Sequence, residues 1–188
     1  MTANALRDDE ESEDWLETDR LVLRPLAISD ASWISAGSSN LAVSRMTGRI
    51  PYPNPLIGAE LYVLTCRAAE INRGDRVRAI LLKDTGEGIG MIGLHPRSDG
   101  PWEFGYWLGE PFWGRGYATE AGHALLDAAM HDGITAIAAG HYADNPASGR
   151  VLEKLGFAYT GEVVNAFSAG RMGCAPCPRM VRSANPAL

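Results

Sequence analysis

The sequence predicts a mixed α/β (α+β) domain in which helices cover the faces of a central sheet. Strand-like and helix-like segments follow one another in the order β-α-α-β-β-β-α-β-α-β-β, which packs as a mixed sheet with helices on its faces. A chain of 188 residues fits one domain, since single domains reach roughly 250 residues. Its 46% apolar and 21% charged residues are typical of a globular chain rather than a disordered or fibrous one.

The first predicted elements are a strand and a short helix. The apolar run at residues 20–26 predicts the strand, and Ser29 or Asp30 caps a helix that runs through Ser35. The segment from Arg45 to Pro55 contains three prolines and other turn residues, so we expect a loop there.

A longer helix follows this loop. Asn54 and Pro55 provide a cap and a proline at the first position, and Gly74 ends the helix. Its larger apolar side chains recur at spacings of three and four, which predicts one buried stripe. The stripe consists of Ile57, Leu61, Leu64, Ala68 and Ile71. Cys66 lies toward the stripe, so we expect its thiol to be buried.

The rest of the chain predicts strands and helices in succession. They are a strand at 77–83, a hairpin turn at 84–88, a returning strand at 89–95, a strand at 102–108, a glycine-rich turn at 113–116, a helix at 118–131, a strand at 134–140, a helix from Asn145 to Gly156, and a final pair of strands from Phe157.

The net charge of -6 is unevenly placed along the chain. Residues 1–20 hold eight acids and two bases, a net charge of -6, so residues 21–188 are neutral overall. We therefore interpret residues 1–17 as an acidic flexible tail and residues 18–188 as a single domain. The pI near 5.2 and the absence of a basic block argue against a dedicated nucleic-acid binder.

Hydropathy and cysteine usage indicate a cytoplasmic protein. No apolar run approaches the roughly 18 residues of a membrane span, and the acidic N-terminus is unlike a signal peptide, so we expect no membrane partner. Cys66, Cys174 and Cys177 are too few and too clustered for a disulfide frame. The C-x-x-C at 174–177 lacks the context of a redox pair, and no two histidines stand at ligand spacing, so we expect no metal site.

One glycine pattern is a false match. Gly88, Gly90 and Gly93 satisfy the dinucleotide-binding spacing G-x-G-x-x-G. That pattern must follow a strand and open a helix, whereas these glycines lie within a hairpin strand. We assign them to turn and strand geometry, and a nicotinamide oxidoreductase would rest on this pattern alone.

The segment Trp113-Gly114-Arg115-Gly116-Tyr117-Ala118-Thr119 has the context that the first pattern lacks. It follows a strand and starts a helix, so backbone N–H groups and the positive helix end can converge on an anion. Gly114 and Gly116 let the backbone come close, and Arg115 can add charge. The segment lacks the G-K-[ST] of a P-loop, so triphosphate hydrolysis is not implied. An ordinary strand-to-helix turn is the alternative.

Two further motifs flank this segment. Glu103-Phe104-Gly105-Tyr106-Trp107-Leu108 precedes it, and the run from Asn145 to Phe157 follows one helix and one strand later. Together with W-G-R-G-Y-A-T-E-A at residues 113–121, they resemble the GNAT acetyltransferase superfamily, and most closely its RimJ/RimL-like branch. The resemblance implies the GNAT fold, a central mostly antiparallel mixed sheet that is splayed at the cofactor strand, with helices on both faces.

The resemblance implies acetyl-CoA as cosubstrate and no metal. Trp113, Gly116 and Ala118 fill the places of the superfamily's pyrophosphate loop Q/R-x-x-G-x-G/A, with Trp113 departing from Q/R, and residues 115–119 would hold the pyrophosphate. The strand before the loop pairs with the pantetheine arm in this family, a role that falls on Trp107 and Leu108. Asn145 looks like the asparagine that bonds the pantetheine amide, and a simple helix cap is its alternative role.

The chemistry needs a base, an oxyanion donor and an acid. Glu103 is the candidate base, because alternation places it on the same face as Trp107 and a carboxylate in a partly dry cleft can take the amine's proton. A solvated strand carboxylate is the alternative. A free backbone N–H near Leu108 would bind the oxyanion. The family's usual tyrosine acid is replaced by Leu152, so the candidate acid is Ser148, whose alternative role is to cap its helix.

We therefore predict an N-acetyltransferase that moves the acetyl group of acetyl-CoA to a primary amine by direct attack, without an acyl-enzyme, as a monomer or homodimer. The acceptor is a protein N-terminal α-amine or a small-molecule amine, and the loops at 36–55 and 165–178 decide between them. The alternative is a catalytically weak GNAT module that binds CoA and acts as a sensor or regulator.

Overall fold

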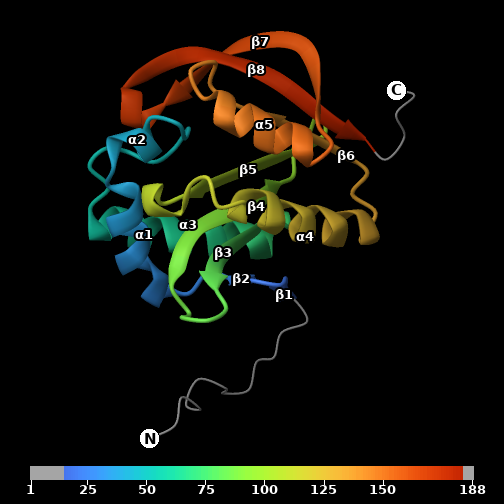
Figure 1. The fold of residues 1–188 in the computed structure, drawn as a ribbon. Coiled ribbons are helices and arrows are strands. Elements are labelled where there is room, and N and C mark those ends of the chain that lie inside the picture. Colours follow the sequence, from blue (N-terminus) through green and yellow to red (C-terminus); the bar gives the residue numbers. More distant parts are fainter. Residues whose placement is uncertain (1–14, 184–188) are drawn as a thin grey trace, which may run out of the picture.

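The strands form one sheet in the order β1-β2-β3-β4-β5-β6-β8-β7 in the computed structural model, which describes residues 15–183 (Figure 1). The strands are β1 (Leu16–Glu17), β2 (Leu21–Pro25), β3 (Arg76–Leu82), β4 (Gly88–His95), β5 (Trp102–Leu108), β6 (Ala136–Gly140), β7 (Ala158–Ser168) and β8 (Gly173–Ser183). Neighbouring strands are antiparallel except β5 and β6, which are parallel. The predicted mixed, mostly antiparallel sheet is confirmed.

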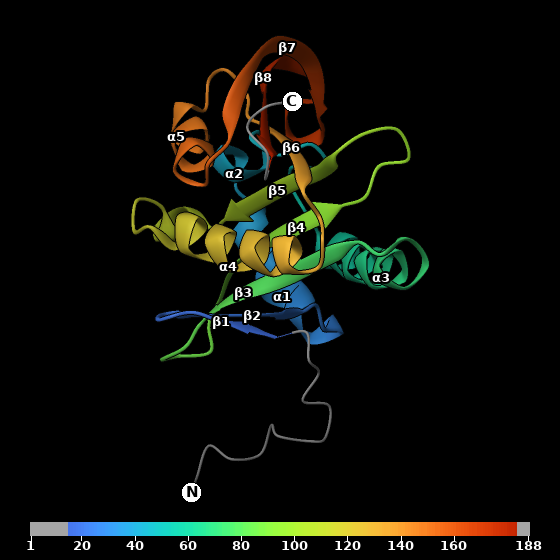
Figure 2. The same cartoon turned by 90° about the vertical axis from the view of Figure 1, so that its right-hand side faces the viewer.

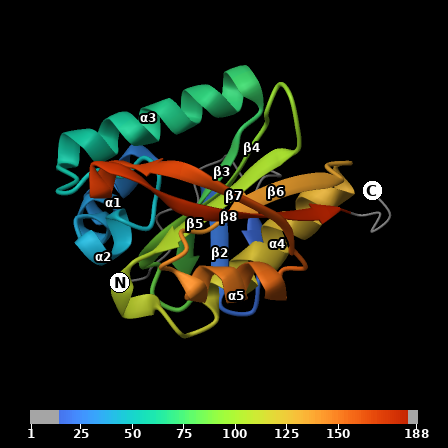
Figure 3. The same ribbon diagram turned by 90° about the horizontal axis from the view of Figure 1, so that it is seen from above.

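Helices cover both faces of this sheet. The α-helices are α1 (Ala31–Ser38), α2 (Leu41–Ser44), α3 (Leu56–Arg73), α4 (Tyr117–His131) and α5 (Pro146–Lys154), and short 3-10 helices span Ile28–Asp30, Glu110–Phe112 and Ala169–Arg171. Figures 2 and 3 show α3 on one side of the sheet and α4 on the other. Short α2 was not predicted, and α1 continues three residues beyond the predicted end at Ser35.

Each face of the sheet has its own apolar core. On the side of α4 and α5, Phe104 and Leu108 of β5 pack with Leu126 and Leu152. On the side of α1 and α3, Trp107 packs in a second cluster that includes Ile34, Val63 and Met91. Because strand side chains alternate between faces, β5 contributes to both cores.

The predicted buried stripe of α3 is wrong. Its large side chains are exposed, from 53% for Leu64 to 84% for Ile71. The helix instead buries a face of smaller residues, namely Ala59, Val63, Cys66 and Ala69. Both sets recur at helical spacing, so periodicity alone could not choose between them, and the small set allows α3 to approach the sheet closely. The buried position expected for Cys66 is confirmed.

The folded part begins before Thr18, where the domain was expected to start. Leu16 and Glu17, assigned to the flexible tail, pair with Leu23 and Val22 as β1. An ion pair of 2.9 Å between the Glu17 carboxylate and Lys83 also fixes this segment. Pairing with β2 satisfies the backbone hydrogen-bonding groups of this segment. The acidic composition of the segment gave no sign of this strand. The rest of the predicted tail, residues 1–14, lies outside the described residues.

The glycines of the false dinucleotide pattern are explained by close packing. A Cβ at Gly88 would overlap the Trp33 indole, and one at Gly90 would overlap the Trp107 carbonyl. Gly93 lies against Val77 and His95. These positions on β4 need small residues because α1 approaches Gly88, β5 approaches Gly90, and β3 and the His95 ring lie against Gly93.

Cys174 and Cys177 lie on strand β8, three residues apart and therefore on opposite faces of the sheet. Cys174 is exposed and Cys177 is buried. Within residues 15–183 no three metal-binding side chains of His, Cys, Asp or Glu gather at one point. No helix in the same range is long and apolar enough to cross a membrane.

Asp30 fastens the end of β2 to α1. Its buried carboxylate accepts hydrogen bonds from the Arg24 guanidinium at 2.7 and 2.8 Å, from the Ala27 N–H at 2.8 Å and from the Trp33 indole at 3.0 Å. Burial alone would raise the pKa of Asp30, but the hydrogen bonds from Arg24, Ala27 and Trp33 outweigh it and lower the pKa below 3.8. Trp33 in turn packs 6.4 Å from Trp107, so this network supports β5.

Replacing Asp30 by asparagine should destabilise the fold by about 3 kcal/mol at pH 7, because Arg24 then keeps its charge without a partner. The folded-state pKa of Asp30 is lowered, so its ionised form stabilises the fold above the unfolded-state pKa of about 3.9, and this stabilisation is lost as the pH falls through the folded-state pKa. Urea unfolding of the wild type and Asp30→Asn should therefore show a difference that shrinks below about pH 4. Exposed Asp99→Asn is the control, and an equal loss in both variants would contradict this role.

Candidate active site

A first cleft of about 440 Å³ opens at the end of β5, between the N-terminus of α4 and α5. It is lined by every predicted cofactor residue except Arg115: Trp107, Leu108, Trp113, Gly114, Gly116, Tyr117, Ala118, Thr119 and Asn145. The carbonyl oxygen of Arg115 accepts a hydrogen bond of 3.1 Å from Arg20. The two neighbouring motifs at 103–108 and 113–121 therefore meet the more distant motif from Asn145 in one cleft.

The N-terminus of α4 is open toward this cleft. Gly114 and Gly116 have φ angles of 73° and 83°, a left-handed conformation that favours glycine. Gly116 is the N-cap and no side chain caps the helix, so the first N–H groups of α4 have no partner within the helix. An uncapped helix end with free N–H groups is an anion-binding arrangement.

Arg20 forms an ion pair with Glu120 beside the same helix end. Its Nε donates to the Glu120 carboxylate at 2.7 Å, and its guanidinium lies 4.5 Å from the centre of the Tyr117 ring. Burial opposes ionisation of Glu120, but hydrogen bonds from Thr18 and Arg20 lower its pKa. The side chain of Arg20 thereby joins β2 to the first turn of α4.

The backbone of β5 is open where it borders the first cleft. β5 pairs with β6 only at Trp102 and Glu103, and the two strands then separate. On the other edge, the Gly109 N–H bonds Ile89 at 2.9 Å, so the alternation of an antiparallel pair directs the groups of Leu108 away from β4. The Leu108 N–H thus faces the gap, as expected for a free donor near this residue. By the same alternation, the backbone groups of Trp107 face β4.

Trp113 holds the loop onto the end of β5. Its indole Nε1 donates to the Leu108 carbonyl at 2.8 Å. Trp113, which stands where the family usually has Gln or Arg, therefore binds the carbonyl oxygen of Leu108. The N–H of Leu108 is not engaged by this contact.

Ser148 and Tyr106 form a hydroxyl pair at the inner wall of the first cleft. The Tyr106 hydroxyl donates to Ser148 Oγ at 3.0 Å, and burial raises the pKa of Tyr106 to about 12. The Asn145 side chain caps α5 by accepting from the Ser148 N–H at 3.2 Å. The cap of α5 is therefore Asn145, and the hydroxyl of Ser148 is engaged with Tyr106.

A second cleft of about 340 Å³ lies on the opposite face of β5 and is bordered by residues of β4, β6, β7 and β8. Its walls include Arg49, Tyr62, His95, Glu103, His141 and Arg179. The two clefts share six lining residues: Met46, Thr47, Tyr106, Trp107, Asn145 and Ser148. A molecule in one cleft can therefore meet a molecule in the other beside Tyr106 and Ser148.

Glu103 lies in the second cleft as alternation predicted, and it is ion-paired there. Arg179 of β8 donates two hydrogen bonds to its carboxylate, at 2.9 and 2.7 Å. The Glu103 carboxylate raises the pKa of Arg179, while burial raises the pKa of the neighbouring Cys177 thiol. Both carboxylate oxygens of Glu103 are occupied, and this arrangement argues against a free base at that position.

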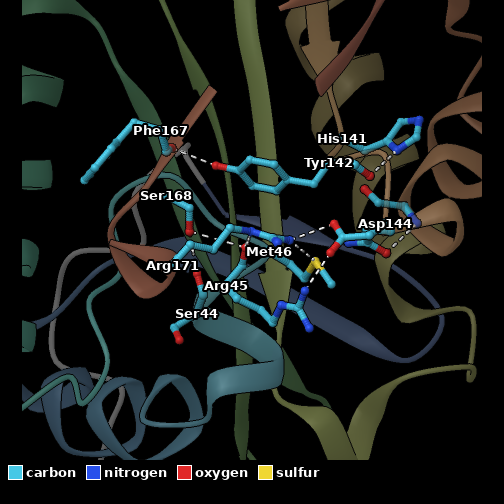
Figure 4. A network of polar contacts seen from close by, with 11 residues as sticks. Ser44, Arg45, Met46, His141, Tyr142, Asp144, Phe167, Ser168 and Arg171 are labelled. Atoms are coloured by element: carbon cyan, nitrogen blue, oxygen red, sulfur yellow. Dashed lines mark hydrogen bonds and ion pairs between the residues drawn. The ribbon is translucent and has the colours of Figure 1, made fainter. Parts of the chain in front are cut away.

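A polar network ties together the segments that border the junction of the two clefts (Figure 4). Asp144 accepts hydrogen bonds from Arg45 at 2.6 Å and from Arg171 at 2.7 Å. Arg171 also donates to the Arg45 carbonyl at 2.7 Å, and the Tyr142 hydroxyl donates to the Phe167 carbonyl at 2.7 Å. The loop after α2, the loop before α5 and the β7–β8 tip are thereby fixed to one another, next to the shared lining residues.

Comparison with known proteins agrees with this arrangement. The sequence profile of the acetyltransferase (GNAT) domain matches residues 20–158. The chain belongs to the GNAT family. The uncharacterized N-acetyltransferase YoaA of Bacillus subtilis is 33% identical to this GNAT chain over 149 residues, which are 78% of this chain and 84% of the relative. This chain is accordingly an N-acetyltransferase, which transfers an acetyl group from acetyl-CoA to an amine.

Solved structures share its GNAT fold. The RimL ribosomal α-N-protein acetyltransferase in complex with coenzyme A aligns with a TM-score of 0.77 and 19% identity over 90% of this chain and 97% of that one. Mycobacterium smegmatis RimJ aligns with a TM-score of 0.76 and 19% identity over 87% of this chain and 82% of that one. The microcin C7 self-immunity acetyltransferase MccE, in complex with acetyl-CoA and AMP, has a TM-score of 0.74 at 16% identity over 88% and 93%.

The sequence motifs assigned no role to several residues of the site. Tyr106 lies within the motif at 103–108 but received no role there, and its hydroxyl bonds Ser148. His95, Asp75 and Arg179 carry no motif, and they come together only when β4, the turn after α3 and β8 meet at the second cleft. Strand alternation places His95 on the same face of β4 as Gly93. This alternation was the one feature of the sequence that could have placed His95 in the second cleft.

Replacing Gly116 by alanine should weaken acetyl-CoA binding, because its φ of 83° is strained for a side chain and relaxation would turn N–H groups of α4 away from the cleft. Gly133→Ala is the matched control, since Gly133 also has a φ of 83° and follows the other end of α4. Both variants should lose about 1–2 kcal/mol of stability. Calorimetric titration with acetyl-CoA should show weaker binding in Gly116→Ala only, and equal affinities would refute the assignment.

Proposed function

We propose that this GNAT enzyme holds acetyl-CoA in the first cleft and an amine acceptor in the second, and transfers the acetyl group directly where the clefts meet. The observation that carries the proposal is the meeting of two clefts, on opposite faces of β5, beside the Leu108 N–H and the Tyr106–Ser148 pair. A cosubstrate and an acceptor can then approach each other without a covalent enzyme intermediate.

The described residues fit the chemical groups of acetyl-CoA. The uncapped N-terminus of α4, with Gly114 and Gly116, suits the pyrophosphate, and the charge of Arg115 can supplement it. The open edge of β5 offers hydrogen bonds to the amides of the pantetheine arm. By the register, Leu108 and its neighbour Tyr106 present backbone groups there, which replaces the role predicted for the Trp107 backbone.

The same open edge supplies the oxyanion donor. Attack of an amine on the thioester carbonyl places negative charge on the carbonyl oxygen, and a fixed N–H aimed at that oxygen stabilises the charge. The Leu108 N–H is such a donor, because β6 has separated and Trp113 occupies only the carbonyl of Leu108.

Ser148 is the proposed general acid for the thiolate that leaves. Ser148 Oγ accepts a hydrogen bond from the Tyr106 hydroxyl, so the hydroxyl proton of Ser148 is free to point into the cleft. Once Ser148 has given this proton to the sulfur, the Tyr106 hydroxyl is in place to restore it. The pair thus takes the place of the tyrosine that Leu152 replaces, and buried Leu152 packs in the core instead.

The base role predicted for Glu103 stays a prediction. Glu103 lies in the acceptor cleft, but its bidentate pair with Arg179 has to open before either oxygen takes a proton. Within this arrangement, a structural role for the Glu103–Arg179 pair, joining β5 to β8 across the cleft, accounts for all of its contacts.

The charges of the second cleft bear on the acceptor class. Arg49 lines this cleft without a hydrogen bond or ion pair in the described chain, and Glu103 is neutralised by Arg179. An acceptor that carries several positive charges is disfavoured there, because it would meet the charge of Arg49. The α-amine of a neutral peptide N-terminus and a small-molecule amine both satisfy this condition. The structural neighbour RimL is named as a ribosomal α-N-protein acetyltransferase, which supports the first class.

Acetyl transfer should appear as release of free thiol from acetyl-CoA across a panel of peptides and small amines. Bound acetyl-CoA at a hundredfold excess over its Kd should add about 2.7 kcal/mol of stability, which corresponds to a rise in Tm of roughly 5–10 °C. NAD serves as the control and should leave Tm unchanged. Stabilisation by NAD alone, or binding of acetyl-CoA without thiol release for any acceptor, would contradict the proposed function.

Ser148→Ala should lower kcat by about 100-fold, because the leaving thiolate loses its proton donor. Tyr106→Phe should cause a smaller loss, since Ser148 then lacks only its resupply. The Kd for acetyl-CoA should change little in either variant, because the Asn145 cap of α5 depends on the Ser148 backbone N–H. Steady-state kinetics with exposed Ser32→Ala as control measures both effects, and an unchanged kcat in Ser148→Ala would remove its catalytic assignment.

A further inference from the structure

A histidine and a buried aspartate form a pair at the far end of the second cleft. His95 is the last residue of β4, and Asp75 follows the end of α3. His95 Nδ1 lies 2.5 Å from Asp75 Oδ2, and the carboxylate is only 3% exposed. Arg73 Nε donates to the other oxygen, Oδ1, at 3.1 Å. The Asp75 carboxylate is therefore held from two sides and fixes the orientation of the imidazole.

The second nitrogen of this imidazole is free. Within residues 15–183 no hydrogen bond or ion pair engages His95 Nε2, and His95 lines the second cleft. Nε2 lies over Gly93, since a Cβ on that glycine would come within 3.2 Å of it. A ring with one nitrogen bound to a buried carboxylate and the other free in a cleft is the arrangement of a base with its orienting group.

His95 also occupies the place expected for the base. In the antiparallel register of β4 and β5, His95 is directly opposite Glu103. The two side chains therefore stand side by side at the same level of the cleft. Glu103 has both oxygens bound to Arg179, whereas His95 keeps Nε2 free.

The floor between His95 and the junction of the clefts has no side chains. The next pair in register toward the junction on this face is Gly93 and Gly105, followed by Met91 and Trp107. A Cβ added at Gly105 would meet nothing within 4 Å. Four residues of strand separate His95 from Met91, roughly 13 Å. The open space over Gly105, next to the ring of His95 over Gly93, leaves room for water along this path.

We propose that His95, oriented by Asp75, receives through water on this glycine floor the proton that the acceptor ammonium must lose before it attacks the thioester. The inference rests on the proposed function and adds the base for it. One proton leaves the ammonium nitrogen and reaches His95 Nε2. The nitrogen lone pair then forms the C–N bond, the C–S bond breaks, and the thiolate takes its proton from Ser148. The nitrogen loses a second proton as the amide forms, and this proton returns through water to the Ser148–Tyr106 hydroxyl pair.

The acid–base behaviour of His95 depends on several neighbours around the cleft. They are Asp75 in the turn after α3, Arg73, Tyr62 and Cys66 of α3, Arg49 in the loop before α3, Glu103 of β5, and Cys177 and Arg179 of β8. Burial raises the pKa of Tyr62 and of both thiols, so these groups stay neutral near pH 7. Among the residues that the structure describes, Asp75 is the carboxylate that bonds the ring.

The test is the pH dependence of kcat/KM for thiol release in His95→Gln, Asp75→Asn and Glu103→Gln. His95→Gln should lower kcat/KM by about 100-fold at neutral pH and remove the limb of the profile that the base produces, leaving the titration of the acceptor amine. Asp75→Asn should move that limb to lower pH, because the imidazolium loses its carboxylate partner. Glu103→Gln should keep the limb in place.

Two measurements separate this role from a merely structural one. Imidazole added to the buffer should restore part of the rate of His95→Ala, and the Kd for acetyl-CoA should stay within twofold of the wild type in all three glutamine and asparagine variants. His123→Gln, an exposed histidine of α4, is the matched control.

Equal pH profiles in the wild type and His95→Gln would overturn the inference while leaving the proposed function intact, and so would a limb that disappears in Glu103→Gln instead. Absence of thiol release by the wild type with every acceptor would overturn both.

Discussion

The early separation of β5 from β6 is the constraint on which the rest of the structure depends. The two parallel strands pair at only two positions, Trp102 and Glu103, although β5 continues to Leu108. β6 pairs instead with β8 along its whole length. Backbone groups without a partner cost roughly 1–3 kcal/mol each when buried, so an open edge persists where a ligand or solvent can meet it. The first cleft exists because β5 and β6 separate and leave this edge unpaired.

A single strand therefore organises two binding regions. Side chains of β5 alternate between faces, so Tyr106 and Leu108 border the first cleft with α4 and α5, while Glu103 and Gly105 face the second. The backbone edge of β5 lies between them. Under the proposed function, cosubstrate and acceptor are recognised by different elements and meet at one short stretch of chain. Asp144 and the arginines that bind it fix the surrounding loops around this meeting point.

Features that depend on neighbours in the chain could be predicted from the sequence. The glycines at 114 and 116 indicate the turn into α4, and Asn145 before Pro146 indicates the cap of α5. Both features depend only on residues within one turn of backbone. The stripe of α3 shows where this reasoning fails. Periodicity identified two possible faces, and close approach to the sheet selected the one with small residues.

The sequence by itself determined the order of the elements apart from β1 and α2, the resemblance to the GNAT family, the glycine-rich loop before α4 and the place of Ser148 at the start of α5. Only the tertiary structure decided that Glu103 is bound by Arg179, that Tyr106 supports Ser148, and that His95 is held by Asp75. The physical reason is distance along the chain. A cap or a turn needs only adjacent residues, whereas an ion pair between β5 and β8 forms between side chains 76 positions apart and leaves no local pattern.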